Sequence, residues 1–302
     1  MPIIDAHIHF ADRPGFARTA RAAGHVNSVA HLQQTFADTG IVFAVAMGSG
    51  NGLQSGEVCA PMTVDLAGPL SLDPYNQPQE IGYCCGIESA ALRAHTLQQT
   101  LDLFERHLQN PHCVGLKLYP GYNAFYPADP IHAPFYELAQ AYGVPVVIHT
   151  GDTARASAHV KYAHPLAVDD AAVTYPKVQF VMAHYGNPWI VDATEVAKKN
   201  PNVAIDLSGL AEGQFARDWF LQTYAGYVSH LQTWMAYLSD PGKLMFGSDW
   251  PLVHLPTYVS LMQAIVPEAW HDAVFFQNAQ RIFSRIPALL APSGGAAPHP
   301  LP

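Results

Sequence analysis

The sequence is poor in charged residues. Only 13% of its 302 residues are Asp, Glu, Lys or Arg, about half of the roughly 25% that is usual in soluble proteins. The 15 basic residues form no cluster and are outnumbered by 24 acidic ones, which argues against a nucleic-acid or anionic-membrane partner. Hydrophobic residues reach 49%, enough for a sizeable core. Because so little polar surface remains, we expect a homo-oligomer.

Cysteine is scarce, and long apolar runs are missing. The four cysteines show no CxxC spacing, and Cys84 and Cys85 lie inside the apolar run IGYCCGI, where free thiols behave as small hydrophobic groups. Reduced cysteines are expected in a reducing compartment. The start MPIIDAHIHF carries Asp5, His7 and His9, which interrupt a signal-peptide core, and no stretch approaches the ~18–20 apolar residues of a membrane span. We therefore expect a soluble, cytoplasmic protein without a membrane partner.

Nucleotide-binding glycine motifs are also missing, since no G-x-G-x-x-G follows the first apolar run and no P-loop occurs. The chain instead contains eight continuously apolar runs, which are typical of parallel strands covered on both faces. They are PIIDAHI, IVFAVAM, IGYCCGI, CVGLKLY, VPVVIHT, VQFVMAH, VAIDLSG and KLMFGSD. Eight strand–helix units fit a (β/α)8 TIM barrel better than an open doubly wound sheet. We predict one α/β barrel domain over residues 1–290 and a disordered Pro/Gly/Ala-rich tail over 291–302.

Segments between these runs predict helices. From Leu97, apolar residues recur at steps of four, three and four up to Leu108, which forms one stripe of a helix, and Pro111 stops it. We predict further helices over residues 135–142, 166–175, 191–199, 215–238 and 278–283. His95 and His107 belong to the segment before Pro111, and we expect both to be solvated.

Polar side chains stand at the carboxyl ends of the predicted strands, where a barrel builds its active site. They are His7, His9, Lys117, His149, His184 and Asp249. His7 and His9 are two residues apart, so both leave an extended strand on the same face, as two nitrogen ligands of one metal would. Such a pair also arises by chance in a chain with 16 histidines. An imidazole or carboxylate that ends an apolar strand, as at His149 and Asp249, is costly to bury unless it is paired or metal-bound.

Six segments, in order from Asp5 to Phe283, carry a resemblance to a known family. They are IDAHIHF, GLKLYPGYNAFYPADP, PVVIHTG, FVMAHYG, FGSDWP and QNAQRIF. The chain resembles the amidohydrolase superfamily, in the amidohydrolase 2 branch that includes aminocarboxymuconate semialdehyde decarboxylase and resorcylate decarboxylase. The resemblance implies one divalent metal, usually zinc, held by a ligand set of His7, His9, His149 and Asp249. It also implies that His184 is either an acid/base residue or a ligand of a second ion.

Lys117 has three interpretations. In binuclear members of the superfamily a lysine of the fourth strand is carboxylated and bridges two metals, and GLKLYP matches that strand. A lysine kept neutral by burial could react with carbon dioxide in this way. Alternatively, Lys117 is an ammonium that binds a substrate carboxylate, or it pairs with a nearby acid.

The residue chemistry agrees with a catalytic metal. Zinc accepts nitrogen and carboxylate ligands and leaves one position open for water in catalytic sites. It lowers the pKa of that water to about 7, so a nucleophile exists at neutral pH. Asp249 could accept the proton of the attacking water, and His184 could polarise the substrate carbonyl or protonate the leaving group.

Other residues are candidates for the pocket wall or for supporting roles. Tyr119, Tyr122 and Tyr126 follow the fourth strand and Trp250 follows Asp249, and such loops line the pocket of a barrel. Arg155 is either a carboxylate clamp or a solvated loop residue. Two carboxylates on strands, Asp5 and Asp206, are candidates for orienting the histidines.

The leading expectation is a metal-dependent hydrolase of an amide, ester or lactone bond in a small organic molecule. The alternative is a metal-dependent, non-oxidative decarboxylase of an aromatic or unsaturated acid. Both chemistries use one metal site, so sequence separates them poorly. A second alternative is a barrel that binds a ligand without catalysis, against which the complete set of ligand residues argues.

Overall fold

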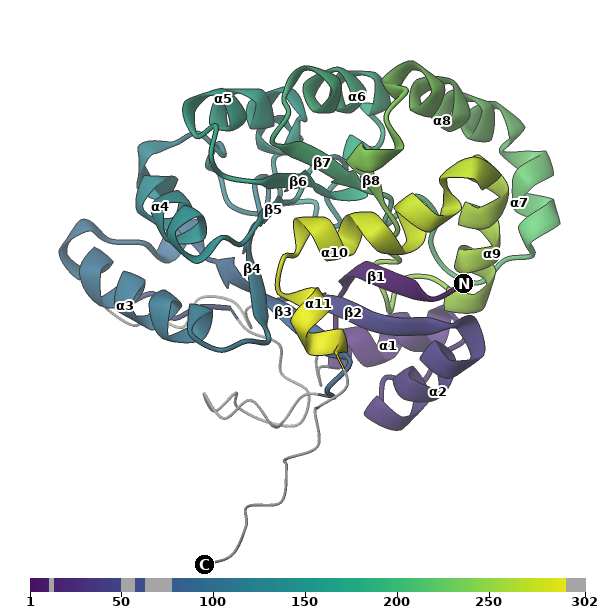
Figure 1. Ribbon diagram of the computed structural model, residues 1–302, viewed down its shortest axis with the longest axis horizontal. Helices are drawn as coiled ribbons and strands as arrows, with labels where there is room; N and C mark the ends of the chain where they lie inside the picture. The colour runs from purple at the N-terminus through teal and green to yellow at the C-terminus, as the bar shows by residue number, and fades with distance from the viewer. Residues whose placement is uncertain (11–13, 50–57, 63–77, 292–302) are drawn as a thin grey trace, which may run out of the picture.

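The computed structural model describes residues 1–10, 14–49, 58–62 and 78–291. Eight parallel strands follow one another around a single sheet in the order β1 to β8 (Figure 1). They are β1 Ile3–Ile8, β2 Ile41–Met47, β3 Ile81–Ile87, β4 Cys113–Leu118, β5 Val146–Ile148, β6 Phe180–Met182, β7 Val203–Asp206 and β8 Leu244–Met245. Each strand lies in one of the predicted apolar runs, which confirms the (β/α)8 barrel. The tail predicted over 291–302 lies, except for Ala291, outside the described residues.

Backbone hydrogen bonds join the first strand to the segment around β8 and so close the barrel. The Ala6 amide donates to the Phe246 carbonyl (2.9 Å), and the Asp249 amide donates to the His7 carbonyl (2.8 Å). A parallel bridge between Ile8 and Trp250 follows. The closure places the ends of β1 and β8, with their ligand-type residues, beside each other.

The helices surround the strands (Figure 1). They are α1 Pro14–Ala22, α2 Val29–Thr39, α3 Leu97–Leu108, α4 Ala133–Tyr142, α5 Leu166–Thr174, α6 Ile190–Lys199, α7 Arg217–Thr223, α8 Ala225–Leu238, α9 Leu255–Ile265, α10 Asn278–Ile282 and α11 Ile286–Leu290. The single helix predicted over 215–238 is wrong, because Tyr224 leaves the helical conformation (φ −105°, ψ 30°) and separates α7 from α8.

Two hydrophobic clusters hold the barrel together. The inner one collects side chains from all eight strands, together with α10 and α11 residues, and the outer one lies between the strands and helices α2 to α9. Leu116 and Leu118 belong to the outer cluster, so Lys117 between them points into the barrel, because side chains alternate along a strand.

The expectation that His95 and His107 are both solvated is wrong for His107. His95 is exposed as expected, but His107 is buried and its Nδ1 lies 3.0 Å from the Tyr83 hydroxyl. It shares the inner face of α3 with Phe104, three residues earlier, and so packs against the sheet.

The four cysteines are free and buried. Cys85 and Cys113 lie on the adjacent strands β3 and β4, with their sulfur atoms 3.7 Å apart. Among the described residues, no helix combines the length and the apolar character that crossing a bilayer requires.

His25 is buried and contacts the start of α9, and from its burial we predict that the fold is sensitive to acid. The Leu255 amide donates to Nε2 of His25 (3.0 Å), so Nδ1 carries the proton that faces Nε2 of His31 (3.0 Å). Burial, with His254 and His31 nearby, lowers the pKa of His25 from 6.5 to about 4. Below pH 6.5 the unfolded chain therefore binds a proton that folded His25 refuses, and we expect the free energy of unfolding to fall between pH 6.5 and 4.

Urea unfolding of wild type and His25→Gln across this range checks the prediction. The variant has no group at position 25 that titrates, so its stability should depend less steeply on pH. Equal slopes for the two proteins would show that His25 does not contribute.

Candidate metal centre and active site

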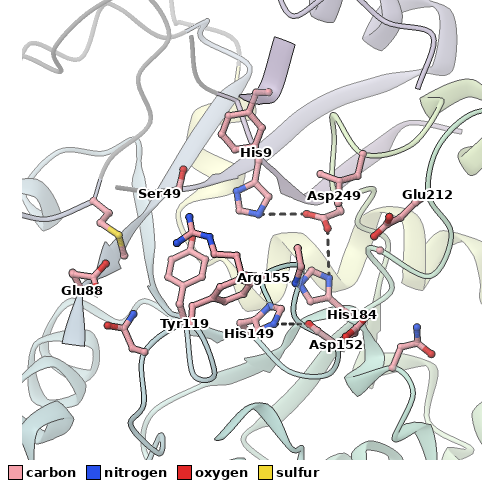
Figure 2. Close-up of a pocket in the computed structure, with 18 residues that line it drawn as sticks. His9, Ser49, Glu88, Tyr119, His149, Asp152, Arg155, His184, Glu212 and Asp249 are labelled. Carbon is pink, nitrogen blue, oxygen red and sulfur yellow. Dashed lines mark hydrogen bonds and ion pairs between the residues drawn. The ribbon is translucent and has the colours of Figure 1, made fainter. Parts of the chain in front are cut away.

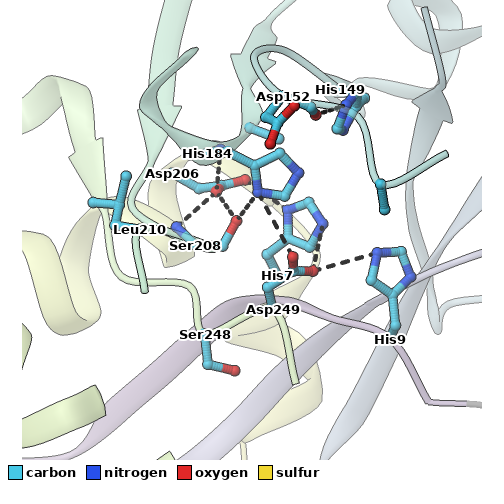
Figure 3. Close-up of polar contacts among 12 residues, drawn as sticks. His7, His9, His149, Asp152, His184, Asp206, Ser208, Leu210, Ser248 and Asp249 are labelled. Carbon is cyan, nitrogen blue, oxygen red and sulfur yellow. Dashed lines mark hydrogen bonds and ion pairs between the residues drawn. The ribbon is translucent and has the colours of Figure 1, made fainter. Parts of the chain in front are cut away.

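The structure brings the ends of β1, β5, β6 and β8 together, and with them the histidines and the aspartate predicted at those ends (Figure 3). Ligand atoms of His7, His184 and Asp249 lie within 4.8 Å of one another, and all three residues are buried. His9 Nε2 is 3.4 Å from Asp249 Oδ1. The His149 ring packs on the His184 ring, with their centroids 5.0 Å apart.

His7 presents a basic nitrogen to this cluster. Its Nδ1 lies 2.8 Å from Asp206 Oδ2, so the ring donates there and keeps a lone pair on Nε2, which faces Asp249 Oδ1 at 3.7 Å. Burial, and then the positive charge of Lys117, lowers the pKa of His7 well below its ordinary value. His7 is thus a neutral imidazole, the form that ligates metals.

His149 is oriented in a similar way by the backbone. Its Nε2 lies 2.9 Å from the Asp152 carbonyl oxygen, so Nε2 carries the proton and Nδ1 keeps the lone pair. Burial, and then Lys117, lowers the pKa of His149 to about 3. A carbonyl acceptor of this kind fixes the tautomer of a histidine that ligates a metal.

Asp249 lies between the histidines in a strained backbone conformation, with φ 64°. Its Oδ1 faces His7 and His9, and its Oδ2 lies 3.9 Å from His184 Nδ1. Burial raises the pKa of Asp249 to about 8, and Lys117 opposes the rise. His184 and Tyr185 also have positive φ angles of 61° and 49°, and strain of this kind gathers at functional sites.

Two buried acceptors in the centre match a cation. His7 Nε2 and Asp249 Oδ1 have no hydrogen-bond partner within the part of the chain that the structure describes. Two acceptors that face each other across 3.7 Å gain nothing from one another, and their burial is costly unless a proton or a metal cation lies between them. Imidazole nitrogens with one carboxylate oxygen form a donor set that suits zinc and related divalent ions.

Lys117 lies within the barrel and not on the cavity wall. It is fully buried, and its Nζ has no hydrogen-bond partner among the described residues. Burial lowers the pKa of Lys117 to about 8, against the opposing charges of Asp206 and Asp249. Lys117 therefore makes no direct hydrogen bond to an acid among the described residues, and it interacts with Asp206 and Asp249 through their charges alone.

The two candidate supporting carboxylates have different contacts. Asp206 reaches the His7 ring, whereas Asp5 accepts from the backbone amides of His7 (3.2 Å) and Ser248 (2.9 Å). Asp5 thus links β1 to the segment after β8 through hydrogen bonds, whereas Asp206 orients the imidazole of His7.

A cavity of about 340 Å³ opens above the centre (Figure 2). Of the residues predicted for its wall, Tyr119, Tyr122 and Arg155 line it. Trp250 does not, because the left-handed turn at Asp249 sends its fully buried ring against His25, with centroids 4.2 Å apart. Tyr126 packs on Tyr162 instead, with centroids 4.6 Å apart.

Several wall residues were missed by the sequence analysis. They are Phe16, Ser49, Met62, Glu88, Asn123, Asp152, Asn187, Glu212 and Leu252. Glu88 directly follows β3, so the rule that strand ends carry site residues could have found it. Burial raises its pKa, and Arg155 opposes the rise.

Gly209 allows the close contact between Asp249 and His184. A Cβ atom there would lie 3.0 Å from His184 Nδ1 and 3.3 Å from Asp249 Oδ2, and its φ is 63°. An alanine at position 209 would therefore push the His184 and Asp249 side chains away from their positions. We expect Gly209→Ala to lower kcat by about 10-fold or more, because small displacements of reacting groups slow catalysis strongly. Gly213→Ala is the matched control, since Gly213 has a φ of 77° and nothing within 4 Å of its Cβ position.

Both variants carry the cost of a left-handed alanine, and the crowding of His184 and Asp249 adds to the loss of thermal stability in Gly209→Ala alone. Only Gly209→Ala should lose activity. Equal activity in the two purified variants would show that the contact of Gly209 with the site is unimportant.

Comparisons with known proteins show the family and the fold of the chain. The family model described as Amidohydrolase matches residues 87–285, whereas no curated protein matches the chain. An uncharacterized TIM-barrel protein from Bordetella bronchiseptica is 18% identical with a TM-score of 0.65, over 94% of this chain and 99% of that one.

Two further solved structures are similar to the chain. One is a probable 2-pyrone-4,6-dicarboxylic acid hydrolase from Acinetobacter baumannii (16% identity, TM-score 0.60, 94% of this chain and 100% of that one). The other is a 5-carboxyvanillate decarboxylase from Novosphingobium aromaticivorans, complexed with manganese (13% identity, TM-score 0.60, 94% and 96%). At these identities the likeness establishes the fold alone. The family match, which spans well over half of the sequence, goes further, and the chain belongs to the amidohydrolase family of metal-dependent enzymes.

Proposed function

We propose that the protein is a hydrolase that cleaves an amide, ester or lactone bond of a small organic molecule. The position of Asp249 carries this proposal. Its Oδ1 faces the nitrogens of His7 and His9, while its Oδ2 lies on the side of His184, which lines the cavity. A carboxylate placed in this way can bind a cation through one oxygen and accept a proton from attacking water through the other.

The ligands in the proposal are His7, His9, His149 and Asp249. When bound, a divalent cation supplies Lewis-acid activation of water and of the substrate carbonyl. Asp249 takes the proton of the attacking water, and His184 returns a proton to the leaving group as its bond to the carbonyl carbon breaks. Both groups line the cavity and expose only a small part of their side chains (12% for His184 and 9% for Asp249), so few water molecules compete for these protons.

We propose that the site binds one metal ion and that this ion is zinc. Nitrogen-rich sites with one carboxylate favour zinc, although manganese also accepts such donors. The ligand atoms gather around Asp249, while Lys117 lies apart from the cavity lining, so a second ion bridged by carboxylated Lys117 has less support.

Arg155 is the proposed binding group for an anionic part of the substrate. It lines the cavity, and its guanidinium carbon lies 5.8 Å from the centroid of the Tyr122 ring, which also packs against His149 at 4.9 Å. A planar guanidinium held on an aromatic face suits a carboxylate. The substrate would then place its scissile bond at the metal ligands and a carboxylate near Arg155.

Arg155→Ala tests this assignment. We expect KM to rise about 10-fold or more for a substrate with that carboxylate, because a charge-assisted hydrogen bond is worth roughly 1.5–3 kcal/mol. A neutral analogue with the same scissile bond is the control, and its KM should change little. Equal changes for both substrates would remove Arg155 from substrate binding.

Decarboxylation of an aromatic or unsaturated acid is the second candidate. It is favoured by the rings of Phe16 and Tyr122 on the cavity wall and by Phe16 stacking on His9, with centroids 5.9 Å apart, because aromatic walls suit a flat substrate. In that reaction His184 would supply the proton to the ring carbon that loses carbon dioxide.

A panel of lactones, esters, amides and aromatic acids separates these functions when carbon dioxide and acid release are both measured. Acid release without carbon dioxide supports the hydrolase, and carbon dioxide release supports the decarboxylase. Full metal occupancy with no turnover on the whole panel would instead support the non-catalytic barrel.

We also propose a cytoplasmic homo-oligomer. The free, buried cysteines suit a reducing compartment. Trp219 and Tyr224 of the α7 region are both about half exposed and lie against each other, which suits a subunit contact. Light scattering of the purified protein tests the assembly.

A further inference from the structure

Asp206, a strand carboxylate that the sequence marks as a candidate for orienting histidines, is the centre of a buried hydrogen-bond network at the end of β7 (Figure 3). Its Oδ2 accepts from the His7 ring at 2.8 Å. Its Oδ1 accepts from the backbone amides of His184 and Ser208, both at 3.1 Å, and from the Ser208 hydroxyl. Both Asp206 and Ser208 are buried, so these bonds are shielded from water.

Ser208 forms a second short contact, on the side of the cavity. Its Oγ lies 2.8 Å from His184 Nδ1. A hydroxyl has a single proton, and that proton is donated to Asp206 Oδ1. Ser208 Oγ must therefore accept a hydrogen bond from His184, so His184 carries its proton on Nδ1 and keeps a lone pair on Nε2.

One carboxylate thus sets the tautomer of two imidazoles. Asp206 acts on His7 directly and on His184 through the Ser208 hydroxyl. In both rings Nδ1 is the donor and Nε2 is the basic nitrogen. Nε2 of His7 faces the metal ligand Asp249. The His184 side chain lines the cavity.

We propose that Ser208 is a positioning residue that keeps His184 in the Nδ1–H tautomer, so that Nε2 carries the proton that is passed to the leaving group. The kinetic part of this inference rests on the proposed hydrolysis. The same contacts argue that His184 is an acid/base residue and not a metal ligand through Nδ1, because the Nδ1 position is taken by the proton donated to Ser208.

The proton balance is simple. The oxygen of water forms a bond to the carbonyl carbon, and one of its protons passes to Nε2 of His184, directly or through Asp249. The bond from that carbon to the leaving oxygen or nitrogen then breaks, and Nε2 donates the proton to the leaving atom. The proton on Nδ1 stays in the hydrogen bond to Ser208, and the charge of the transient imidazolium is stabilised by Asp206 through the hydroxyl.

The tautomer can be measured without any turnover. Long-range ¹H–¹⁵N correlation spectra of histidine-labelled, zinc-loaded protein distinguish the two tautomers, and the spectrum of His184→Gln identifies the signals of His184. We expect the Nδ1–H form in wild type and a mixture of tautomers in Ser208→Ala. A wild-type His184 with its proton on Nε2, or with Nδ1 bound to zinc, would overturn the proposal.

Kinetics provide a second readout on esters that differ only in the leaving group. In Ser208→Ala we expect kcat to fall about 10–100-fold for an alkyl ester and much less for a nitrophenyl ester, whose leaving group departs without a proton. KM and metal content should not change. Ser208→Thr keeps the hydroxyl and should restore most of the alkyl-ester activity.

Ser248→Ala is the matched control, because Ser248 is also buried beside the site but its hydroxyl accepts from the Trp250 amide (3.0 Å). Any loss in this variant should be equal for both esters. An equal loss for both esters in Ser208→Ala, or a loss of metal, would overturn the positioning role. A wild type that hydrolyses neither ester would contradict the hydrolase proposal alone, since the tautomer measurement still decides the role of Ser208.

Discussion

Replacement of Asp249 by asparagine should lower kcat/KM by about 10³-fold or more. The asparagine retains the shape of the side chain but loses the charge that a cation requires, and it cannot accept the proton of the attacking water. Proton transfer by a positioned side chain alone is worth about 10²–10⁴-fold, and the lost metal ligand adds to this. Steady-state kinetics and the metal content of the purified variant measure the two effects.

Asp218→Asn is a matched control for Asp249→Asn, because it removes the same charge from the exposed surface of α7. We expect this control to keep both its metal and its activity. If Asp249→Asn kept full metal content and lost less than 10-fold in kcat/KM, Asp249 would be neither a ligand nor the base.

Asp206→Asn should produce the second large effect, because Asp206 serves both His7 and His184. An asparagine amide that faces His7 Nδ1 with its NH₂ group would favour the wrong tautomer. Metal affinity should then fall about 10–100-fold, as is usual when the hydrogen-bond partner of a ligating histidine is lost. Activity at saturating metal should fall further, because the link through Ser208 to His184 is weakened as well. Metal titration and kcat at saturating metal separate the two losses.

Asp5→Asn is the appropriate comparison, since Asp5 on β1 is equally buried but accepts from the backbone amides of His7 and Ser248, and no hydrogen bond joins it to an imidazole among the described residues. An asparagine oxygen can accept the same two hydrogen bonds, so metal affinity should stay near that of wild type. Similar metal affinities for Asp206→Asn and Asp5→Asn would contradict the role of Asp206 in orienting His7.

Much of the fold could be predicted from the sequence because buried parallel strands have a strong local signature. Even β8, which keeps only two residues in the sheet, lies in an apolar run. By contrast, α9 was not among the predicted helices, although its buried residues Leu255, Tyr258, Met262 and Ile265 recur at helical spacing and form one apolar face.

The candidate site was predictable where it depends on strand ends and unpredictable where it depends on long-range contacts. His7, His149 and Asp249 each follow an apolar run, and the barrel brings such ends together. The hydrogen bond between His7 and Asp206 joins residues 199 positions apart, so no local sequence pattern indicates which histidine Asp206 contacts. Trp250 was placed wrongly because the left-handed backbone of Asp249 turns the next side chain away from the cavity.

Anomalous diffraction near the zinc and manganese absorption edges, from crystals grown without chelator, tests the metal centre most directly. We predict one peak within about 2.0–2.2 Å of a nitrogen of each of His7, His9 and His149 and of an oxygen of Asp249. His184 Nδ1 should instead remain bonded to Ser208. The absence of a peak among these four residues, or a peak bound to His184 Nδ1, would contradict the proposed centre.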